Sequence, residues 1–460
     1  MPEPESRYPF REIGNSGLRR TRGYVQEEFL SDLQGTKAIR VYREMSSNDA
    51  TIGALLFMVE MMVRQANWEL RPYSEEQTDV DKATFTDECL HDMSHTFDDF
   101  LSECLSFLVY GWSYFEEVLK IRLGPDQSDP QYRSQYSDGR IGWRKWAPRP
   151  QSTLDRWEFD ENGGVRGLWQ APANASELNA TEVFIPIEKS LLFRTRSNKN
   201  NPEGESLLRR AYRAWYLKKK IEEIEGIGIE RDLAGLPMML VPPEILDADA
   251  DDNARAVKQE MLDIVTNVRR DEQEGIMLAA VYDENNNPLY DFKLLTTGGR
   301  RQFDTDAIIS RWDHRVAMSI LGDFILLGHK NVGSFAMSKS KIHLFAVAMD
   351  GLLDMIQQVI NRHAIPRLFK INGMPVDRLP MLVHGTVEEP DLEQLGEYIK
   401  NITGASVSLL DYDTQNYLRS VANMPENAVE AEELKMERAS ALVGEQPAVG
   451  GEELDDGTEE

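Results

Sequence analysis

Two histidines and both cysteines lie close together in the sequence, and these residue types are common zinc ligands. His91 and His95 are four residues apart on an expected helix. Cys89 and Cys104 lie nearby. The zinc-protease pattern requires Glu directly after the first His, but Asp92 holds that place, and no third ligand follows at a fitting spacing. We therefore interpret these side chains as parts of a helix surface and core.

The loop Gly328–Ser334, GHKNVGS, has two glycines at the separation found in phosphate-binding P-loops. It lacks the lysine that follows the second glycine in a P-loop and reaches the β- and γ-phosphates. An expected helix, rather than a strand, precedes it. The sequence therefore favours a flexible helix–helix connection over a nucleotide site.

Two acidic groups could bind cations or transfer protons. The run Asp247–Asp252 lacks the glycine and the final glutamate that an EF-hand loop needs, so an acidic lead-in that stabilises the next helix explains it better. Glu116 and Glu117 are adjacent on an expected strand, where their side chains point to opposite faces and cannot act together. With no serine-hydrolase elbow or dinucleotide fingerprint either, we predict no enzyme activity, no catalytic residues, no metal site and no cofactor.

The composition indicates a large, strongly acidic protein. The 460 residues include 51 Lys and Arg against 78 Asp and Glu, a formal net charge of −27. Such a chain can bury a large core in two or more domains or in one elongated subunit. Its charge argues against a surface that grips nucleic acid or docks on anionic membrane. It suits a surface that must stay soluble, or one that repels DNA while surrounding it.

Neither disulfides nor membrane insertion is expected. Only two cysteines are present, and the N-terminus has no apolar signal region. No apolar run approaches the roughly 18 residues of a membrane helix. We expect a soluble protein kept in a reducing compartment.

The first 200 residues predict a mixture of helices and strands. A polar arm with one short helix near Gln26–Gln34 precedes a helix capped by Ser47–Asp49. A second helical region spans 79–110. From Gly111 the apolar period changes to two, and a β-rich block follows with turns at Asp138–Gly139 and Asn162–Gly163. The fold class is therefore α+β.

A loop at Asn198–Gly204 leads into a long helix that extends to Gly235. One face of this helix is apolar and is interrupted by Lys218–Lys220, whose first two lysines each precede a glutamate by four residues. We place this lysine block at a subunit contact or on the outer surface of the helix. Apolar residues on more than one side of the helix suit burial between neighbouring subunits.

The remaining chain predicts an αβ insert between two helices. Strands are expected at Met238–Val241, Ile276–Tyr282 and Asp291–Leu295, with a helix after the first. Helices are expected from Asp304 to Ile325 and from the next loop to Pro366, which should end the second. Weaker helices are expected at 391–401 and 424–442, and the acidic end should be disordered.

Three segments together resemble the portal proteins of tailed bacteriophages, in particular the Mu-like group. They are YGWSYFEEVLK (Tyr110–Lys120), LLFRTRSNKNNPEGESLLRRAYRAWYLKK (Leu191–Lys219) and ILGDFILLGHKNVGSFAMSKSKIHLF (Ile320–Phe345). Their order and spacing match the family over roughly residues 45 to 375. The crown region of the family has no match that we can identify.

The resemblance implies a ring, usually of twelve subunits, at one capsid vertex of the virion. Double-stranded DNA is packaged and ejected through its channel without sequence specificity. Implied partners are terminase, the major capsid protein, scaffold and head–tail adaptor proteins, with no membrane. The protein would be made in the host cytoplasm. Two alternatives stay open: another virion structural or adaptor protein such as a minor capsid protein, and a DNA-processing enzyme.

The resemblance also implies an elongated, portal-like subunit with long stem and wing helices, a β-rich wing and an αβ clip. The expected segments are as follows: an N-terminal arm (1–45), the wing (46–202), the first stem helix (203–235), the clip (236–302), the second stem helix (303–324), the tunnel loop with a long wing helix (325–375), a crown-like region (376–442) and an acidic tail (443–460).

Site residues follow from these segments. The tunnel loop would be Gly328, His329, Lys330, Asn331, Val332, Gly333 and Ser334. Lys330 is its candidate to contact DNA phosphate. The stem residues would be Leu208, Tyr212, Trp215, Trp312 and Val316.

Overall fold

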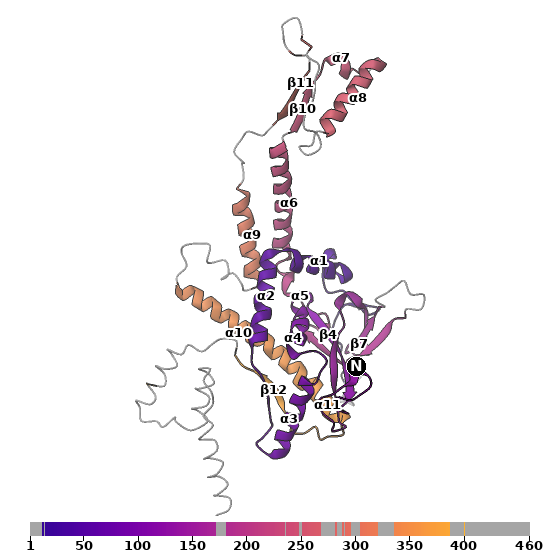
Figure 1. Ribbon diagram of the computed structural model, residues 1–460, viewed down its shortest axis with the longest axis vertical. Coiled ribbons are helices and arrows are strands. Elements are labelled where there is room, and N and C mark those ends of the chain that lie inside the picture. Colours follow the sequence, from indigo (N-terminus) through magenta and orange to yellow (C-terminus); the bar gives the residue numbers. More distant parts are fainter. Residues whose placement is uncertain are drawn as a thin grey trace, which may run out of the picture. The chain divides into compact units, whose positions relative to one another are not determined.

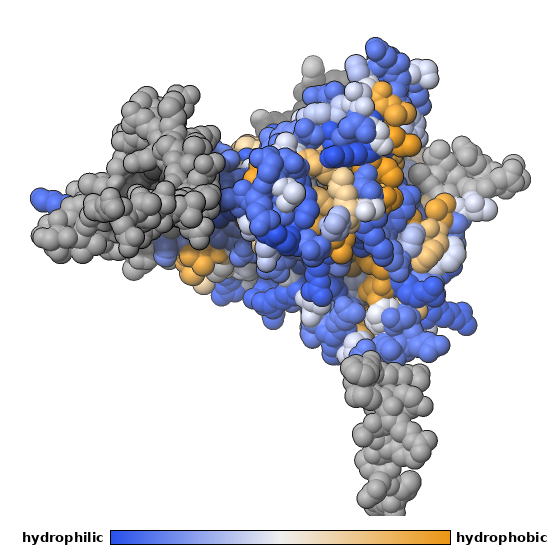
Figure 2. All heavy atoms as spheres, turned by 90° about the horizontal axis from the view of Figure 1, so that it is seen from below, coloured by the Kyte–Doolittle hydropathy of each residue, from blue (hydrophilic) through white to orange (hydrophobic). Residues whose placement is uncertain are grey.

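Helices and strands occur in separate runs along the chain in the computed structural model (Figure 1). It describes residues 12, 14–171, 181–234, 236–247, 251–267, 281–282, 288, 290–295, 304–320, 335–386 and 400. The chain divides into two units, Met1–Gly385 and Thr386–Glu460. Nearly all described residues belong to the first unit. Hydrophilic residues dominate the face shown in Figure 2, with apolar patches between them.

Helices α1 (Gly35–Asn48) and α2 (Ala50–Gln65) meet at Asp49. The Asp49 carboxylate accepts a hydrogen bond of 3.0 Å from the Ile52 amide, so the predicted cap is confirmed. The short helix expected near 26–34 is a 3-10 helix of three residues, Ser31–Leu33. The expectation that the arm extends to residue 45 is wrong, because α1 begins at Gly35. The polar residues of α1 obscured the helical spacing of Tyr42 and Met45, which are buried. Strands β1 (Arg20–Thr21) and β2 (Tyr24–Val25) form a small hairpin before it.

The helical region predicted at 79–110 consists of three helices, α3 (Gln77–His91), α4 (Phe97–Cys104) and α5 (Ser106–Tyr110). Thr96 starts α4 with a capping box, because its hydroxyl accepts from the Asp99 amide while the Asp99 carboxylate accepts from the Thr96 amide. His91 therefore ends one helix, and His95 lies in the connection. The expectation that both occupy one helix is wrong.

Two antiparallel three-stranded sheets follow. One has the order β5–β4–β9, from Ile141–Pro148, Trp112–Ile121 and Ser190–Arg194. The other has the order β6–β7–β8, from Leu154–Phe159, Val165–Gln170 and Val183–Pro186. The turn predicted at Asn162–Gly163 joins β6 to β7, with Gly163 at φ 93°. The Asp138–Gly139 turn precedes β5, with Gly139 at φ 69°.

Aromatic side chains pack α4 against the first sheet. The ring of Phe100 lies 4.7 Å from that of Trp146 and 5.1 Å from that of Phe115, both in edge contact. Phe193 on β9 lies 5.8 Å from Phe100. All four side chains are buried, so this cluster fixes α4 on the sheet.

Helix α6 (Tyr212–Ala234) and helix α9 (Thr305–Ser319) lie side by side (Figure 1). A 3-10 turn, Leu207–Arg209, precedes α6. Thr305 donates a hydrogen bond to Glu225, which links the two helices. Between them, β10 (Leu236–Leu240) pairs antiparallel with β11 (Asp291–Leu295), and Leu236 is opposite Leu295. Helices α7 (Pro243–Leu246) and α8 (Asp252–Asn267) follow β10, as an αβ insert requires.

Helix α10 (Phe335–Val359) continues through a π-helical turn (Ile360–Ala364) into α11 (Ile365–Ile371). The expectation that Pro366 ends the helix is wrong. Pro366 lies in the first turn of α11, where its missing amide hydrogen costs little. Strand β12 (Met381–His384) then pairs antiparallel with β3 (Trp68–Arg71).

Several predicted features lie outside the described residues. These are the loop Gly328–Ser334, most of the strand expected at Ile276–Tyr282, the helices expected at 391–401 and 424–442, and the acidic end. The described helices and strands confirm the α+β class.

Candidate functional site

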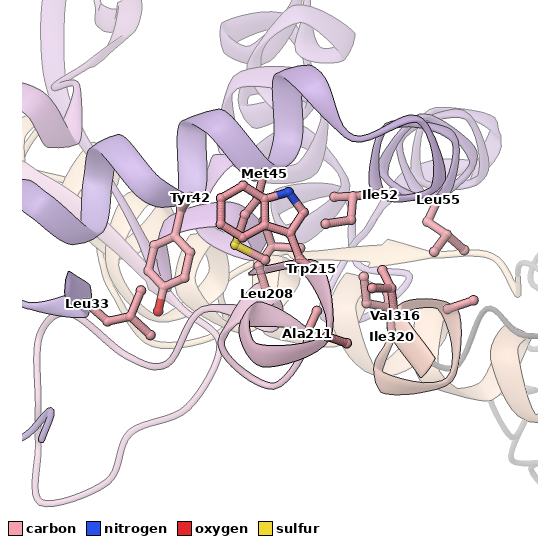
Figure 3. Packing of buried hydrophobic residues seen from close by; sticks show 12 residues of the cluster. Leu33, Tyr42, Met45, Ile52, Leu55, Leu208, Ala211, Trp215, Val316 and Ile320 are labelled. Carbon is pink, nitrogen blue, oxygen red and sulfur yellow. The ribbon is translucent and has the colours of Figure 1, made fainter. Parts of the chain in front are cut away.

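An apolar cluster joins α6 and α9 to the N-terminal helices (Figure 3). We call it the junction cluster. Its buried members are Leu33, Tyr42, Met45, Ile52, Leu55, Leu208, Ala211, Ala214, Trp215, Val316, Ala317 and Ile320. These residues come from three stretches that are far apart in the sequence, 33–55, 208–215 and 316–320, so burial of their apolar surface holds the stretches together.

All five predicted stem residues lie at this junction cluster. Leu208, Trp215 and Val316 belong to its buried set, while Tyr212 and Trp312 are partly buried and pack against it. The Tyr212 hydroxyl also lies 3.2 Å from a carboxylate oxygen of Asp32. The structure therefore brings the five together, and each contacts other parts of its own chain.

A buried lysine links the helices that meet at the junction cluster. Lys218 of α6 is only 5% exposed. Its Nζ lies 2.9 Å from Asp49 Oδ2 and 2.6 Å from Asp313 Oδ1 on α9. Thr51 donates a 2.7 Å hydrogen bond to the same Asp313 oxygen. One ammonium thus holds the α1–α2 connection, α6 and α9 in a single charge network.

Lys218 keeps its positive charge at neutral pH. Burial alone lowers the pKa of Lys218, but the hydrogen bonds to Asp313 and Asp49 outweigh it, so the net shift is upward. Lys218 stays protonated and is paired with two carboxylates, which suits a buried cation.

The placement of the lysine block at a subunit contact or an outer surface is wrong for Lys218. Lys219 also turns towards its own chain, because it pairs with Glu44 of α1. Lys220 is the exposed member and pairs with Glu223, 2.8 Å away. The i, i+4 spacing predicted exposed pairs, but Asp49 and Asp313 lie too far along the sequence to be recognised as partners.

The loop before α6 packs tightly against Gly111. At Gly111, φ is 94°, and a Cβ there would lie 2.3 Å from the Glu203 carbonyl oxygen. The Trp157 indole donates a 3.2 Å hydrogen bond to the Glu203 carboxylate. Burial raises the pKa of Glu203 to about 7, while the bond from Trp157 acts to lower it. No local pattern in the sequence marks this carboxyl group, because Trp157 and Gly111 are both far from it in the chain.

The residues considered for catalysis are engaged in structural contacts. Glu116 pairs with Lys189 at 2.7 Å and with Arg149, whereas Glu117 faces the other side and pairs with Arg367 at 2.7 Å. Their predicted separation onto opposite faces is confirmed.

Both cysteines are buried and unlinked. Burial raises the pKa of the Cys89 thiol to about 12 and also raises that of Cys104, so neither is a ready nucleophile. Across the part of the chain that the structure describes, no group of three or more His, Cys, Asp or Glu could hold a metal ion. No described helix is both long enough and apolar enough to span a membrane.

The family is identified by the match of the chain to a family model. Residues 39–421 match the model of the portal protein of Mu bacteriophage, which is most of the chain. The chain belongs to this portal protein family. The expected resemblance is thereby confirmed, and the portal protein is a structural component of phage particles.

This fold is shared with a solved structure. A chain from the neck of an empty gene transfer agent particle shares 9% identity with this portal protein, with a TM-score of 0.51. The alignment covers 90% of this chain and 97% of that one. An HK97-family phage portal protein from Corynebacterium diphtheriae shares 11% identity over 75% of this chain and 94% of that one, with a TM-score of 0.42.

The first prediction concerns Lys218. In the isolated portal subunit, Lys218→Met should lower the free energy of unfolding by about 3–5 kcal/mol, because it leaves Asp49 and Asp313 without their cation. Lys220→Met removes an exposed pair of the same helix and should leave the free energy of unfolding close to that of the wild type. Urea unfolding of both variants measures the difference. Equal losses would contradict the assigned network.

The second prediction concerns Glu203. Its raised pKa means that the folded chain prefers the protonated form, so this contribution to stability is present below about pH 4.5 and is lost as the pH rises to about 7. Glu203→Gln keeps an oxygen acceptor for Trp157 without a charge. At pH 8 it should be more stable than the wild type by about 1–3 kcal/mol, with no difference near pH 4.5.

Urea unfolding across this pH range measures the Glu203 effect. Glu205→Gln, which changes a more exposed carboxylate in the same loop, is the control and should follow the wild-type profile. Parallel profiles for the wild type and Glu203→Gln would show that Glu203 ionises normally in the folded chain.

Proposed function

We propose that this portal protein forms a ring at one vertex of the capsid, through which double-stranded DNA is packaged and later ejected. The ring would also dock terminase and the head–tail connector proteins, and would act by position rather than by catalysis. The observation that carries the proposal is the family match over residues 39–421. The subunit would be made in the host cytoplasm and become part of the virion.

Within this proposal, α6 and α9 are the two stem helices, and residues 236–302 between them are the clip. The wing would comprise residues 46–202 together with α10, and the tunnel loop would be Gly328–Ser334. The order along the chain supports this assignment: α6 comes first, then the insert that contains β10 and β11, and then α9. The crown assignment to 376–442 rests on order in the sequence alone.

An apolar face on α6 supports assembly with a second copy. Ile227 is nine residues after Lys218, which is two and a half turns, so it lies on the face opposite the junction cluster. Ile227 is 49% exposed, and Ile224 and Tyr216 are 68% and 44% exposed. Large apolar residues gathered on one exposed face are typical of interfaces. A neighbouring stem would bury this face.

Helix α10 shows the same arrangement. Phe345 and Met349 are buried, whereas Val347, two residues from each, lies about 200° round the helix and is exposed. Leu344, one turn before Val347, is exposed too. Two long helices of one subunit thus present an apolar face away from their own core, as a ring with repeated contacts on both sides of each subunit would require.

The acidic composition supports passage of DNA. With a net charge of −27 per chain, a ring would carry a strongly negative field that does not retain a polyanion. A small number of cations would steady the duplex without binding it tightly, because each neutralised phosphate adds affinity. We propose Lys330 for this role.

The third prediction tests ring assembly. Wild-type protein should form rings with a central hole in negative-stain microscopy, at or near twelvefold symmetry. The double variant Ile224→Asn and Ile227→Asn should need at least about tenfold more protein to assemble, because it removes about 1.5–3 kcal/mol of burial per side chain at each contact. Mass photometry across a concentration series measures the shift.

The control for assembly is Glu222→Gln on α6, which changes a polar residue on the side of the helix that carries Lys218. It should assemble like the wild type. A wild-type chain that stays monomeric at high concentration with scaffold present would count against the ring. Unchanged assembly of the double variant would instead show that the apolar face of α6 is not part of the subunit contact.

The fourth prediction tests the channel assignment. Lys330→Ala particles should assemble in normal numbers but package or retain less DNA, because a phosphate contact is lost. Lys330→Arg keeps the charge and should restore DNA content. DNA per particle, measured by quantitative amplification after nuclease treatment, distinguishes the variants. Equal DNA content in all three would refute the role of Lys330.

A further inference from the structure

A small polar cavity lies between β7, β9 and the π-helical turn, away from the junction cluster. Its volume is about 220 Å³, and its lining includes Arg194, Asn200, His363 and Arg367. The cavity is too small for a nucleotide-sized ligand, since such sites commonly exceed about 300 Å³. It is large enough for one small ion with a few waters.

Arg194 is the distinctive group in this cavity. Its guanidinium is held 3.2 Å from Asn200 Oδ1 and 3.1 Å from the Asn201 carbonyl oxygen, both neutral acceptors. No described carboxylate pairs with Arg194, and burial lowers its pKa. A half-buried cation without a counter-ion is unfavourable, so an anion beside it would be stabilised.

The other side chains make the cavity more positive. Arg367 is fixed by Glu117 and by the carbonyl oxygens of Ser190 and Ile187, at 2.7, 2.7 and 2.9 Å. His363 stands on the π-helical turn. Burial lowers the pKa of His363, and the charges of Arg367, Arg362 and Arg194 lower it further. Besides burial, the arginines around this imidazole disfavour its protonated form.

Two irregular backbone segments form the walls. Lys199 and Asn200 have left-handed conformations, with φ of 52° and 55°, which is unfavourable for Lys199 and well tolerated by an asparagine. This conformation places the Asn200 side chain against Arg194. The opposite wall is the π-helical turn, a feature that is frequent at functional sites. Irregular backbone segments thus form two walls of the cavity that contains Arg194.

We propose that this cavity binds a single phosphate group, with Arg194 as its main charged contact and His363 and Arg367 beside it. A tetrahedral oxyanion matches the guanidinium donors and the size of the cavity. The phosphate could be free inorganic phosphate or a phosphodiester of DNA, which present the same oxygens. The proposal does not rest on ring formation.

The fifth prediction is that inorganic phosphate binds saturably, at one site per chain, in calorimetric titration at constant ionic strength with chloride as the background anion. Arg194→Gln should weaken binding at least tenfold. Asn200→Asp should do the same, because its carboxylate would occupy the position of the anion. Arg196→Gln, an exposed arginine two residues away that pairs with Glu205, is the matched control and should bind like the wild type.

A second readout covers the case in which the arginine variant does not fold. Bound phosphate should raise the pKa of the His363 imidazole, measured by NMR on the wild-type chain, because a nearby anion stabilises the imidazolium. Competition by a short DNA duplex would assign the phosphate to DNA, and failure to compete would assign it to free phosphate. Absence of saturable binding, or equal binding by Arg194→Gln and the wild type, would overturn the proposal.

Discussion

The contact of Lys218 with Asp49 and Asp313 is the constraint on which the arrangement of the long helices depends. Asp49 also caps α2, so the same carboxylate starts one helix and anchors another. Removing water from three charged groups is costly unless they satisfy one another, and few relative positions of α1, α2, α6 and α9 allow that. The surrounding apolar cluster supplies attraction, and the charges select the geometry.

A second buried pair organises the β-rich region in a similar way. Glu117 of β4 meets Arg367 of α11, which also binds two backbone carbonyl oxygens. The tight contact of Gly111 with the loop before α6 then connects this region to the junction cluster. The apolar outer faces of α6 and α10 are thereby left exposed, while each inner face is fixed by contacts within the chain.

Local patterns in the sequence predicted the elements, whereas long-range contacts could not be predicted. Asp49 as a cap, the Asn162–Gly163 turn and the opposite faces of Glu116 and Glu117 follow from rules that span a few residues. The partners of Lys218 and Glu203 lie far away in the chain, and no single sequence shows them. The expectation that Pro366 ends its helix is wrong because a preceding π-helical turn lets the helix continue.

The antiparallel pairing of β10 with β11 has an evolutionary consequence. Leu236 faces Leu295, so the chain enters and leaves the intervening module at neighbouring positions. Insertions, deletions or complete exchange of that module between relatives would leave the two supporting helices where they are. Evolution could thus alter this module without altering α6 and α9, the two helices that carry it.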